Sequence, residues 1–371
     1  MPRIAIISPN KDGLTESFIK AHIDNLSFEK FVFYGGFVPS RYADSNIYNP
    51  SLLASALSKL KFVRLRFDFE VSAVIRLLKK LKISLVFAEY GQTGAEMMNI
   101  CRKLDIPLIV HFHGYDAYHR QVLELYHNKY KEMFSYASKI IAVSHDMEKQ
   151  LQKLGSPESK ILYNPYGPND FFYSIKPDFN SNQLLSVGRF VNKKAPFLTI
   201  LAFKKALEIC PELKLMMIGD GCLLDICKMM AKALNLETSL TFAGAIKHEH
   251  LHDFFAKSFC FVQHSVLTPE NDSEGTPVGI LEASAAGLPV IATRHAGISD
   301  IVIHEKTGLL VEEFDVGAMA ESIIHLAKSR QQAQQMGSNG RTFISGHFSL
   351  KEHIARLNQV IHESIKTNER T

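Results

Sequence analysis

Two glutamates, Glu274 and Glu282, stand eight residues apart in a segment whose composition predicts a helix. Thr276 is placed to cap this helix, and Pro277 to occupy its first position. The free backbone amides near Val278 would then bind phosphate. A helix turns by roughly 100° per residue, so the two carboxylates lie within about 80° of each other. Two carboxylates that accept hydrogen bonds from vicinal hydroxyls, on either side of a phosphate site, describe a nucleotide-sugar pocket.

Two glycines of the same segment, Gly275 and Gly279, would let a ligand approach the backbone closely. The alternative is an ordinary capped helix with one exposed glutamate and one whose carboxylate reaches out to solvent. The spacing alone leaves both interpretations open.

Two cations, Arg189 and Lys194, follow the first apolar run of the second half of the chain. Arginine offers a planar fork and lysine a point charge to phosphate oxygens. Fixed cations would stabilise the charge that gathers on a phosphate when its bond to a sugar breaks. The alternative is a pair of solvated surface charges.

Two histidines, His111 and His113, share one face of an extended segment that ends in a His-Gly turn. A neutral imidazole at such a strand end can bind a sugar hydroxyl or transfer a proton. The alternatives are a core histidine and a metal pair with Asp116 or His119, for which no clear third ligand is apparent.

The loop after the first apolar run contains Gly13, which permits an unusual turn, and either Thr15 or Ser17 can cap the helix that follows. Thr15 and Glu16 are candidates to face an acceptor, and the alternative is that Glu16, in the first turn of that helix, merely complements the helix dipole. The chain has no D-x-D triplet, and we expect no metal at the site.

Short apolar runs alternate with helical stretches along the whole chain. The candidate residues outside the Glu274–Glu282 helix follow such runs, except for His111, which lies inside one. The runs are Ile4–Ile7, Phe31–Tyr34, Leu85–Ala88, Leu108–Phe112 and Ile140–Val143, and then Leu184–Val187, Leu213–Ile218, Phe259–Val262 and Pro289–Ala292. This pattern is typical of two parallel sheets flanked by helices. Ligands bind beyond the carboxyl ends of such strands, so we expect the site in a cleft between two units.

The breaker-rich stretch Tyr163–Asn182 separates the two halves. We predict an N-terminal unit over 1–170 on the acceptor side and a nucleotide-sugar-binding unit over 171–348. Residues 349–371 form an amphipathic helix that should pack back toward the first unit. A length of 371 residues with 46% hydrophobic residues suffices for two cores.

The bulk properties exclude several classes of protein. A net charge of +4 is too small to imply nucleic acid, and five scattered cysteines predict reduced thiols. Without an apolar run long enough for a signal peptide or a membrane span, we expect a cytoplasmic protein. Residues 57–82 mix lysine and arginine with apolar side chains, which suits reversible attachment to an anionic membrane. A solvated helix face is the alternative.

Taken in order, these segments resemble the retaining glycosyltransferases of family 4, whose GT-B fold has two Rossmann-like doubly wound domains facing across a cleft. The resemblance covers nearly the whole chain. Its most specific element is the Glu274–Glu282 helix followed by Gly287-Leu-Pro-Val, supported by Gly188-Arg189…Lys194 and Ile218-Gly-Asp-Gly221. With His295-Ala-Gly-Ile, the form of the helix segment resembles bacterial enzymes of colanic acid and other surface polysaccharide assembly.

The resemblance also implies a role for each matching residue. Glu282 would hold the donor ribose, Glu274 the transferred sugar, and His113 the sugar hydroxyls near the reaction centre. The donor diphosphate would be held by Arg189 and Lys194, with Gly13 approaching from the opposite domain and with Gly219, Gly275, Thr276, Pro277 and Val278 completing the donor site. Many members have two adjacent glycines where this chain has only Gly13, and Ala195 replaces a usual glycine.

The implied reaction is the metal-independent transfer of a hexose, with retention, from a UDP- or GDP-linked donor to a saccharide acceptor. The resemblance implies a lipid-linked acceptor in cell-surface polysaccharide or O-antigen assembly at the inner face of the plasma membrane. No cofactor is expected. The alternatives are a sugar-phosphate epimerase or phosphorylase of the same fold, and a non-catalytic subunit that binds nucleotide sugars.

Overall fold

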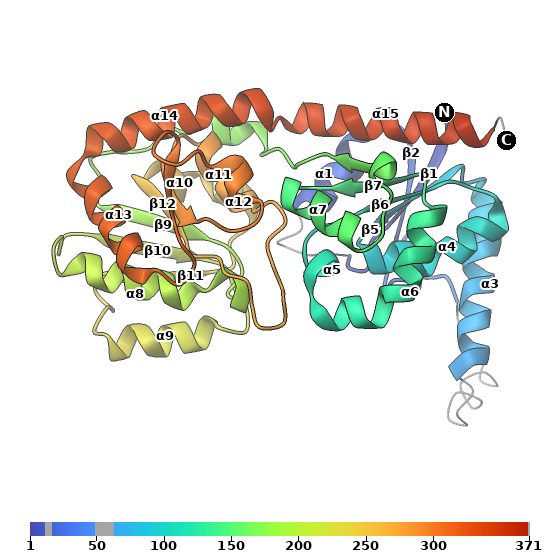
Figure 1. Ribbon diagram of the computed structural model, residues 1–371, viewed down its shortest axis with the longest axis horizontal. Helices are drawn as coiled ribbons and strands as arrows, with labels where there is room; N and C mark the ends of the chain where they lie inside the picture. Colours follow the sequence, from blue (N-terminus) through green and yellow to red (C-terminus); the bar gives the residue numbers. More distant parts are fainter. Residues whose placement is uncertain (12–16, 49–62, 370–371) are drawn as a thin grey trace.

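The computed structural model describes residues 1–11, 17–48 and 63–369, with only the backbone for 63–68. Figure 1 shows two α/β units side by side, with two long helices running along one edge from the second unit to the first. The strand order is β4-β3-β2-β1-β5-β6-β7-β8 in the first sheet and β11-β10-β9-β12-β13-β14 in the second. The predicted architecture of two doubly wound units is confirmed.

The first sheet is parallel except for a short antiparallel extension at one edge. Its parallel strands are β1 (Arg3–Ile7), β2 (Glu29–Tyr34), β5 (Leu85–Glu89), β6 (Leu108–His111), β7 (Lys139–Ala142) and β8 (Ile161–Tyr163), and the extension is β3 (Arg41–Tyr42) and β4 (Ser45–Asn46). The helices of this unit are α1 (Ser17–Asn25), α3 (Val63–Leu81), α4 (Gly91–Leu104), α5 (Tyr115–Tyr118), α6 (Arg120–Tyr136) and α7 (His145–Lys153).

The second sheet is parallel throughout. Its strands are β9 (Gln183–Val187), β10 (Lys214–Ile218), β11 (Leu240–Gly244), β12 (Cys260–Gln263), β13 (Val290–Thr293) and β14 (Gly308–Val311). Its helices are α8 (Pro196–Leu207), α9 (Leu224–Ala233), α10 (His252–Ala256), α11 (Val278–Ala285), α12 (Ile298–Ile301), α13 (Val316–Lys328) and α14 (Arg330–His347). All nine predicted runs are strands. The apolar runs did not indicate β3, β4, β8, β11 and β14, which lie toward the edges of their sheets.

The last helix, α15 (Leu350–Asn368), returns to the first unit (Figure 1). The side chain of Ser349 caps it by accepting from the backbone N–H of Glu352. Its apolar stripe, which includes Leu357 and Ile361, packs in one cluster with Ile4 of β1 and with residues of β5. The helix therefore covers one face of the first sheet, and burial of this stripe holds it there.

The two connections between the units touch each other. A Cβ atom on Gly167, in the first connection, would lie 2.5 Å from the backbone carbonyl carbon of Ser349 in the second and 2.1 Å from the backbone nitrogen of Leu350, where α15 begins. The units also meet directly, since the backbone N–H of His145 donates to Asp300 at 2.9 Å and that of Arg120 donates to the carbonyl of Glu270 at 2.8 Å. No helix of the described residues is long and apolar enough to cross a membrane.

Candidate active site

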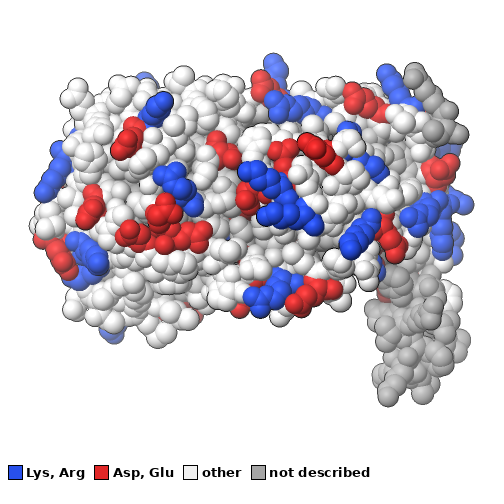
Figure 2. Space-filling model, in the orientation of Figure 1, with Lys and Arg blue, Asp and Glu red and all other residues white. Residues whose placement is uncertain are grey.

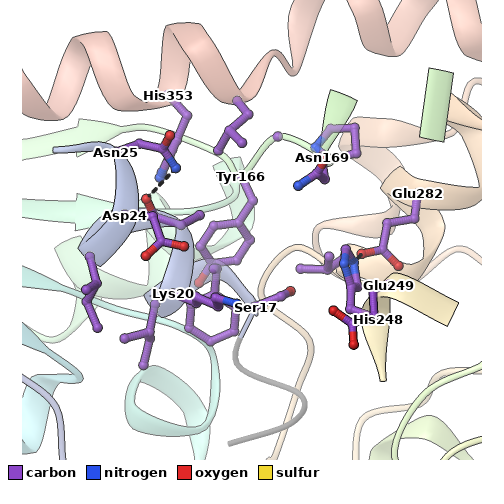
Figure 3. A pocket seen from close by; sticks show the side chains of 18 of the residues that line it. Ser17, Lys20, Asp24, Asn25, Tyr166, Asn169, His248, Glu249, Glu282 and His353 are labelled. Carbon is purple, nitrogen blue, oxygen red and sulfur yellow. Dashed lines mark hydrogen bonds and ion pairs between the residues drawn. The ribbon is translucent and has the colours of Figure 1, made fainter. Parts of the chain in front are cut away.

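A cavity of about 1040 Å³ lies between the two units. Figure 3 shows residues of α1, among them Lys20 and Asp24, on one side and His248 and Glu282 on the other. Tyr166, from the connection between the units, also lines the cavity. The cavity is thus built from both halves of the chain, as the predicted cleft requires.

The helix that carries the two-glutamate motif begins one residue later than predicted. α11 starts at Val278 with Pro277 at its cap position, and no side chain of the described residues caps it. The hydroxyl of Thr276 donates instead to the carbonyl of Val143 in the first unit. The prediction that Thr276 caps the helix is therefore wrong, because this hydroxyl is used in the contact between the units. Val278 and Glu282 line the cavity.

Glu274 and Lys194 form a buried ion pair with 3.0 Å between Nζ and Oε1, and their side chains are 7% and 15% exposed. The hydroxyl of Ser265 also donates to Glu274, at 3.2 Å. Burial by itself raises the pKa of Glu274, but Lys194 and Lys193 lower it to about 2. Glu274 is therefore a fixed negative charge at neutral pH.

Arg189 lies on the surface beside this pair. Arg189 and Lys194 line one small recess at the end of β9, together with Gln263 of β12. The two predicted cations are thus brought together, and an anion that enters the recess would meet both. Neither residue lines the larger cavity, whereas Glu282 does.

Glu282 is held by a partner that the sequence did not indicate. Its carboxylate lies 2.5 Å from Nε2 of His248, in the segment after β11. The imidazole is flanked by the rings of Phe171 and Phe172. Burial lowers the pKa of His248, but Glu282 raises it by more, so the net pKa lies above 6.5. No motif spacing marks His248, because it reaches Glu282 through the fold.

The His113 turn is organised by Asp116. This buried carboxylate accepts hydrogen bonds from the backbone N–H groups of Gly91 at 2.8 Å, His113 at 3.0 Å and Gly114 at 2.9 Å. Gly114 has a φ of 133°, which only glycine adopts readily. The interpretation of Asp116 as a ligand of a metal pair is therefore not supported, since these amides already use its carboxylate.

The side chain of His113 is 3% exposed and bonded on both sides within the protein. Its Nε2 lies 3.0 Å from Glu89, and its Nδ1 is hydrogen-bonded to the hydroxyl of Tyr166 at the cavity wall. His111 is fully buried, with Nδ1 3.2 Å from the carbonyl of Phe112, and is therefore a core histidine. Glu89 directly follows the predicted strand Leu85–Ala88, and this position was the only feature of the sequence that could have marked Glu89 as a site residue.

The predicted glycines bring backbone segments together. A Cβ atom on Gly275 would lie 2.5 Å from the carbonyl oxygen of His113, and one on Gly279 would lie 2.9 Å from that of Val187. Gly219 has a φ of 142°, and its Cβ would lie 1.9 Å from the carbonyl oxygen of Gly188. The close approach expected for a ligand is thus made by protein backbone at these positions. Gly13, Thr15 and Glu16 lie outside the described residues.

Two Rossmann-like units with a cleft between them define the GT-B class, and known structures agree with this. The structure of HepE from Anabaena in complex with UDP-glucose superposes with a TM-score of 0.76 over 98% of this chain and 99% of that chain. The two sequences are 17% identical, so this likeness concerns the fold.

Sequence comparison identifies the family. Residues 38–167 match the family model "Glycosyltransferase Family 4", and residues 170–343 match "Glycosyl transferases group 1". An uncharacterized glycosyltransferase of Methanocaldococcus jannaschii is 30% identical over 290 residues, which cover 76% of each protein. The chain therefore belongs to the glycosyltransferases that these two models describe, and the resemblance inferred from its motifs is confirmed.

A further relative is named for a process. The putative colanic acid biosynthesis glycosyltransferase WcaL of Escherichia coli is 27% identical over 248 residues, which are 65% of this chain. The aligned part spans 61% of the length of WcaL.

Proposed function

We propose that this glycosyltransferase transfers a hexose, with retention of configuration, from a UDP- or GDP-linked donor to a saccharide acceptor in surface polysaccharide assembly. The observation that carries the proposal is that Glu282 lines the cavity between the units, while Lys194 lines the recess at the end of β9 in the second sheet and is paired with Glu274. The name of WcaL and the UDP-glucose in HepE support the process and the donor class.

On the donor side, Glu282 would accept hydrogen bonds from ribose hydroxyls after exchange with His248. Arg189 and Lys194 would bind the diphosphate, and Glu274 the transferred sugar. In the reaction the bond between the anomeric carbon and the phosphate oxygen breaks and a bond to the acceptor oxygen forms. The nucleoside diphosphate leaves, and its added charge is stabilised by the two cations.

On the acceptor side, the face of α1 that lines the cavity offers Ser17, Lys20 and Asp24 (Figure 3). These groups donate and accept hydrogen bonds, which suits a saccharide. They lie across the cavity from Glu282, so an acceptor bound there would face the donor.

We propose that the reaction needs no metal, because Lys194 and Arg189 supply the positive charge that a metal would otherwise supply. The test is donor-dependent transfer measured with chelator and then with added manganese. Unchanged rates support the proposal, and a loss in chelator that manganese restores refutes it.

The donor class is tested by thermal unfolding with UDP-, GDP- and ADP-linked sugars, followed by a transfer assay with the donor that stabilises. A ligand at 100 times its Kd stabilises by about 2.7 kcal/mol. Binding with transfer or hydrolysis supports the proposal. Binding without either indicates a non-catalytic subunit, and epimerisation without transfer indicates the other alternative.

We also propose that residues 57–82 attach the protein to an anionic membrane. The support comes from the basic side chains in the part of this segment that the structure describes. Arg76, Lys79, Lys80 and Lys82 are exposed, whereas Val74 and Leu78 on the opposite side of α3 are buried in the core. The contribution of the described part is therefore electrostatic. On the face of the molecule drawn in Figure 2, basic and acidic side chains are interspersed, so this face does not present a continuous basic surface for a membrane.

Residues 57–62 of this segment lie outside the described residues. Sedimentation with vesicles that contain anionic lipid tests the attachment, by comparison of the wild type with a variant in which Lys79, Lys80 and Lys82 are glutamate. Weaker binding by the variant supports attachment. Equal binding by both proteins, or none by either at low salt, refutes it.

A further inference from the structure

A chain of buried polar side chains runs from the cavity wall to helix α15. The hydroxyl of Tyr166 is bonded to Nδ1 of His113, and Nε2 of His113 lies 3.0 Å from Oε2 of Glu89. Oε1 of Glu89 lies 2.7 Å from Nδ1 of His22, and Nε2 of His22 lies 2.8 Å from Nε2 of His353. The five residues come from β5, α1, α15 and the segments after β6 and β8, so the network joins elements far apart in the sequence.

As a carboxylate, Glu89 sets the hydrogen positions of this network. It has no hydrogen to donate, so the nitrogens of His113 and His22 that face it must both carry hydrogen. A neutral imidazole has one N–H, so Nδ1 of His113 and Nε2 of His22 are acceptors. Tyr166 therefore donates to His113, and His353 donates to His22. Burial lowers the pKa of His22 to about 3 and also lowers the pKa of His113 and of His353, which keeps the rings neutral.

The same assignment accounts for the remaining ring nitrogens. Nδ1 of His111 faces a carbonyl and must carry hydrogen, which leaves Nε2 of His111 as a lone pair. Nδ1 of His353 is also left as a lone pair. In the described part of the chain, these two nitrogens have no hydrogen-bond partner. With Glu89 as a carboxylate, each hydrogen bond from Tyr166 to His353 thus has one donor and one acceptor, and the backbone carbonyls of Asn164 and Pro165 also act on the ring of His353.

We infer that Glu89 is a positioning residue of the sugar transfer, and that His22 and His353 extend its network so that α15 supports the same site. Glu89 holds His113 with Nδ1 as a hydrogen-bond acceptor toward the cavity wall. That nitrogen accepts from Tyr166, or from a sugar hydroxyl that takes the place of the Tyr166 hydroxyl. The inference rests on the proposed function, in which His113 forms hydrogen bonds with the sugar hydroxyls.

Glu89→Gln tests this directly. The amide has one oxygen and one NH2 group, so it can accept from only one of the two imidazoles, and the other must change its tautomer. We expect kcat to fall about 10- to 100-fold, the range for partners that orient functional histidines in metal sites. The Kd of the nucleoside diphosphate should stay within about twofold, because its proposed contacts lie in the second unit. Nitrogen NMR of the histidine side chains should show a changed tautomer for His113 or His22.

Val86→Ala is the matched control. Val86 is buried in the same strand, and its side chain alternates to the opposite face from that of Glu89. This variant loses core packing and touches none of the network, so it should be less stable with an unchanged kcat. A loss of stability alone is thereby separated from a loss of positioning.

A second variant, Tyr166→Phe, removes the hydroxyl at the other end of His113 while it keeps the ring. If both residues act through the orientation of His113, the double variant Glu89→Gln/Tyr166→Phe should lose less kcat than the product of the single losses. Losses that multiply, a wild-type kcat in Glu89→Gln, or a stoichiometric metal ion in the purified protein would each overturn the inference.

The metal measurement matters because two groups among the described residues have ligand atoms within 4.8 Å of one another, namely His22, His111 and His353, and Glu89, His111 and His113. An ion bound to either group would take a ligand atom away from the hydrogen-bond network. If the wild type binds no nucleotide sugar, the proposed function is refuted instead. The tautomers of His113 and His22 still test the role of Glu89 in that case, because NMR needs no activity.

Discussion

Lys194 and Glu274 carry opposite charges and are both buried, so each stabilises the ionised form of the other. Glu274 stays ionised because its pKa is held at about 2. We expect Lys194→Ala and Glu274→Ala each to reduce turnover by about 10²–10³ at saturating donor, the scale of one lost transition-state contact. Steady-state transfer kinetics measure this, and near-normal turnover in either variant would show that the assigned roles are wrong.

The same pair also affects stability. Removal of one partner leaves the other charge buried and unpaired, which costs about 3–5 kcal/mol in buried pairs. The double variant should therefore lose less stability than the sum of the two single losses. Urea unfolding of the three variants gives this comparison, and it separates loss of turnover from loss of folded protein.

The His248–Glu282 pair predicts a dependence of donor affinity on pH. The pKa of His248 is raised above 6.5, so the pair is complete below the unfolded value and is lost as the pH rises through the folded value. Loss of the charge on His248 releases Glu282 for ribose hydroxyls. We expect the KM for the donor to fall as the pH rises through this pKa, and to lose that dependence in His248→Ala.

His250→Ala is the control for this experiment. His250 lies in the same short turn, and its side chain is 69% exposed and next to Glu249 rather than Glu282. Its removal should leave the pH dependence of KM as in the wild type. A flat profile in the wild type, or a profile in His248→Ala that matches the wild type, would contradict the proposed exchange at Glu282.

At the scale of residues, the sequence identified charged groups whose spacing is local. Glu274 and Glu282 share a helix segment, and Arg189 and Lys194 share a loop, so their type and order are visible along the chain. Their partners are not visible in this way. His248 reaches Glu282 from 34 positions away, through the packing of a loop after β11, and no periodicity describes such a contact.

At the scale of elements, the turn after β6 depends on one carboxylate that bonds three backbone amides. In Asp116→Asn, the side-chain NH2 group would face the N–H of Gly91 or those of His113 and Gly114. A buried donor left without an acceptor costs about 1–3 kcal/mol. We expect urea unfolding to show a loss of that size, with reduced transfer because the His113 turn is displaced.

Asp225→Asn gives the reference for this substitution. Asp225 lies on α9 with a side chain that is 91% exposed, so the change should alter stability by less than about 0.5 kcal/mol. If Asp116→Asn were equally neutral, the amides of the turn would be satisfied in another way, and the proposed role of Asp116 would be wrong.

Elements were predictable where an apolar run is continuous and buried. β5 and β6 are such runs, because a parallel strand is covered on both faces. β11 is half exposed and mixed in composition, so its sequence resembles a loop. The start of α11 was displaced by one residue for another reason, since the hydroxyl of Thr276 bonds across the interface instead of capping its own helix. Helix-capping preferences read from a local sequence do not account for a competing hydrogen bond to another unit of the protein.

At the scale of the whole molecule, the sequence indicated two units and a cleft, because the run pattern repeats on both sides of a breaker-rich stretch. It did not indicate which groups meet across the fold. His22 and His353 are 331 positions apart and lie 2.8 Å from each other, and this contact requires α15 to return to the first sheet. The network behind His113 is therefore a property of the complete fold.

The contact between the two connections can be tested at Gly167. Its φ is not positive, so a change to alanine would ordinarily stabilise by about 0.4–1 kcal/mol through the unfolded chain. Here the added Cβ would lie 2.1 Å from the nitrogen and 2.5 Å from the Cα of Leu350, and backbone cannot rotate away as a side chain can. The steric term should therefore decide the sign, and we expect Gly167→Ala to destabilise by about 1–3 kcal/mol, the usual cost of overpacking.

Gly346→Ala is the matched control, because this glycine lies in α14 close to the second connection and an added Cβ would meet no atom within 4 Å. It should be neutral or stabilise by up to about 1 kcal/mol. Urea unfolding of both variants measures the difference. If the two changes had the same effect, the connections could separate at no cost. α15 would then be held by its apolar stripe alone, and its position relative to the second unit would not depend on the crossing at Gly167.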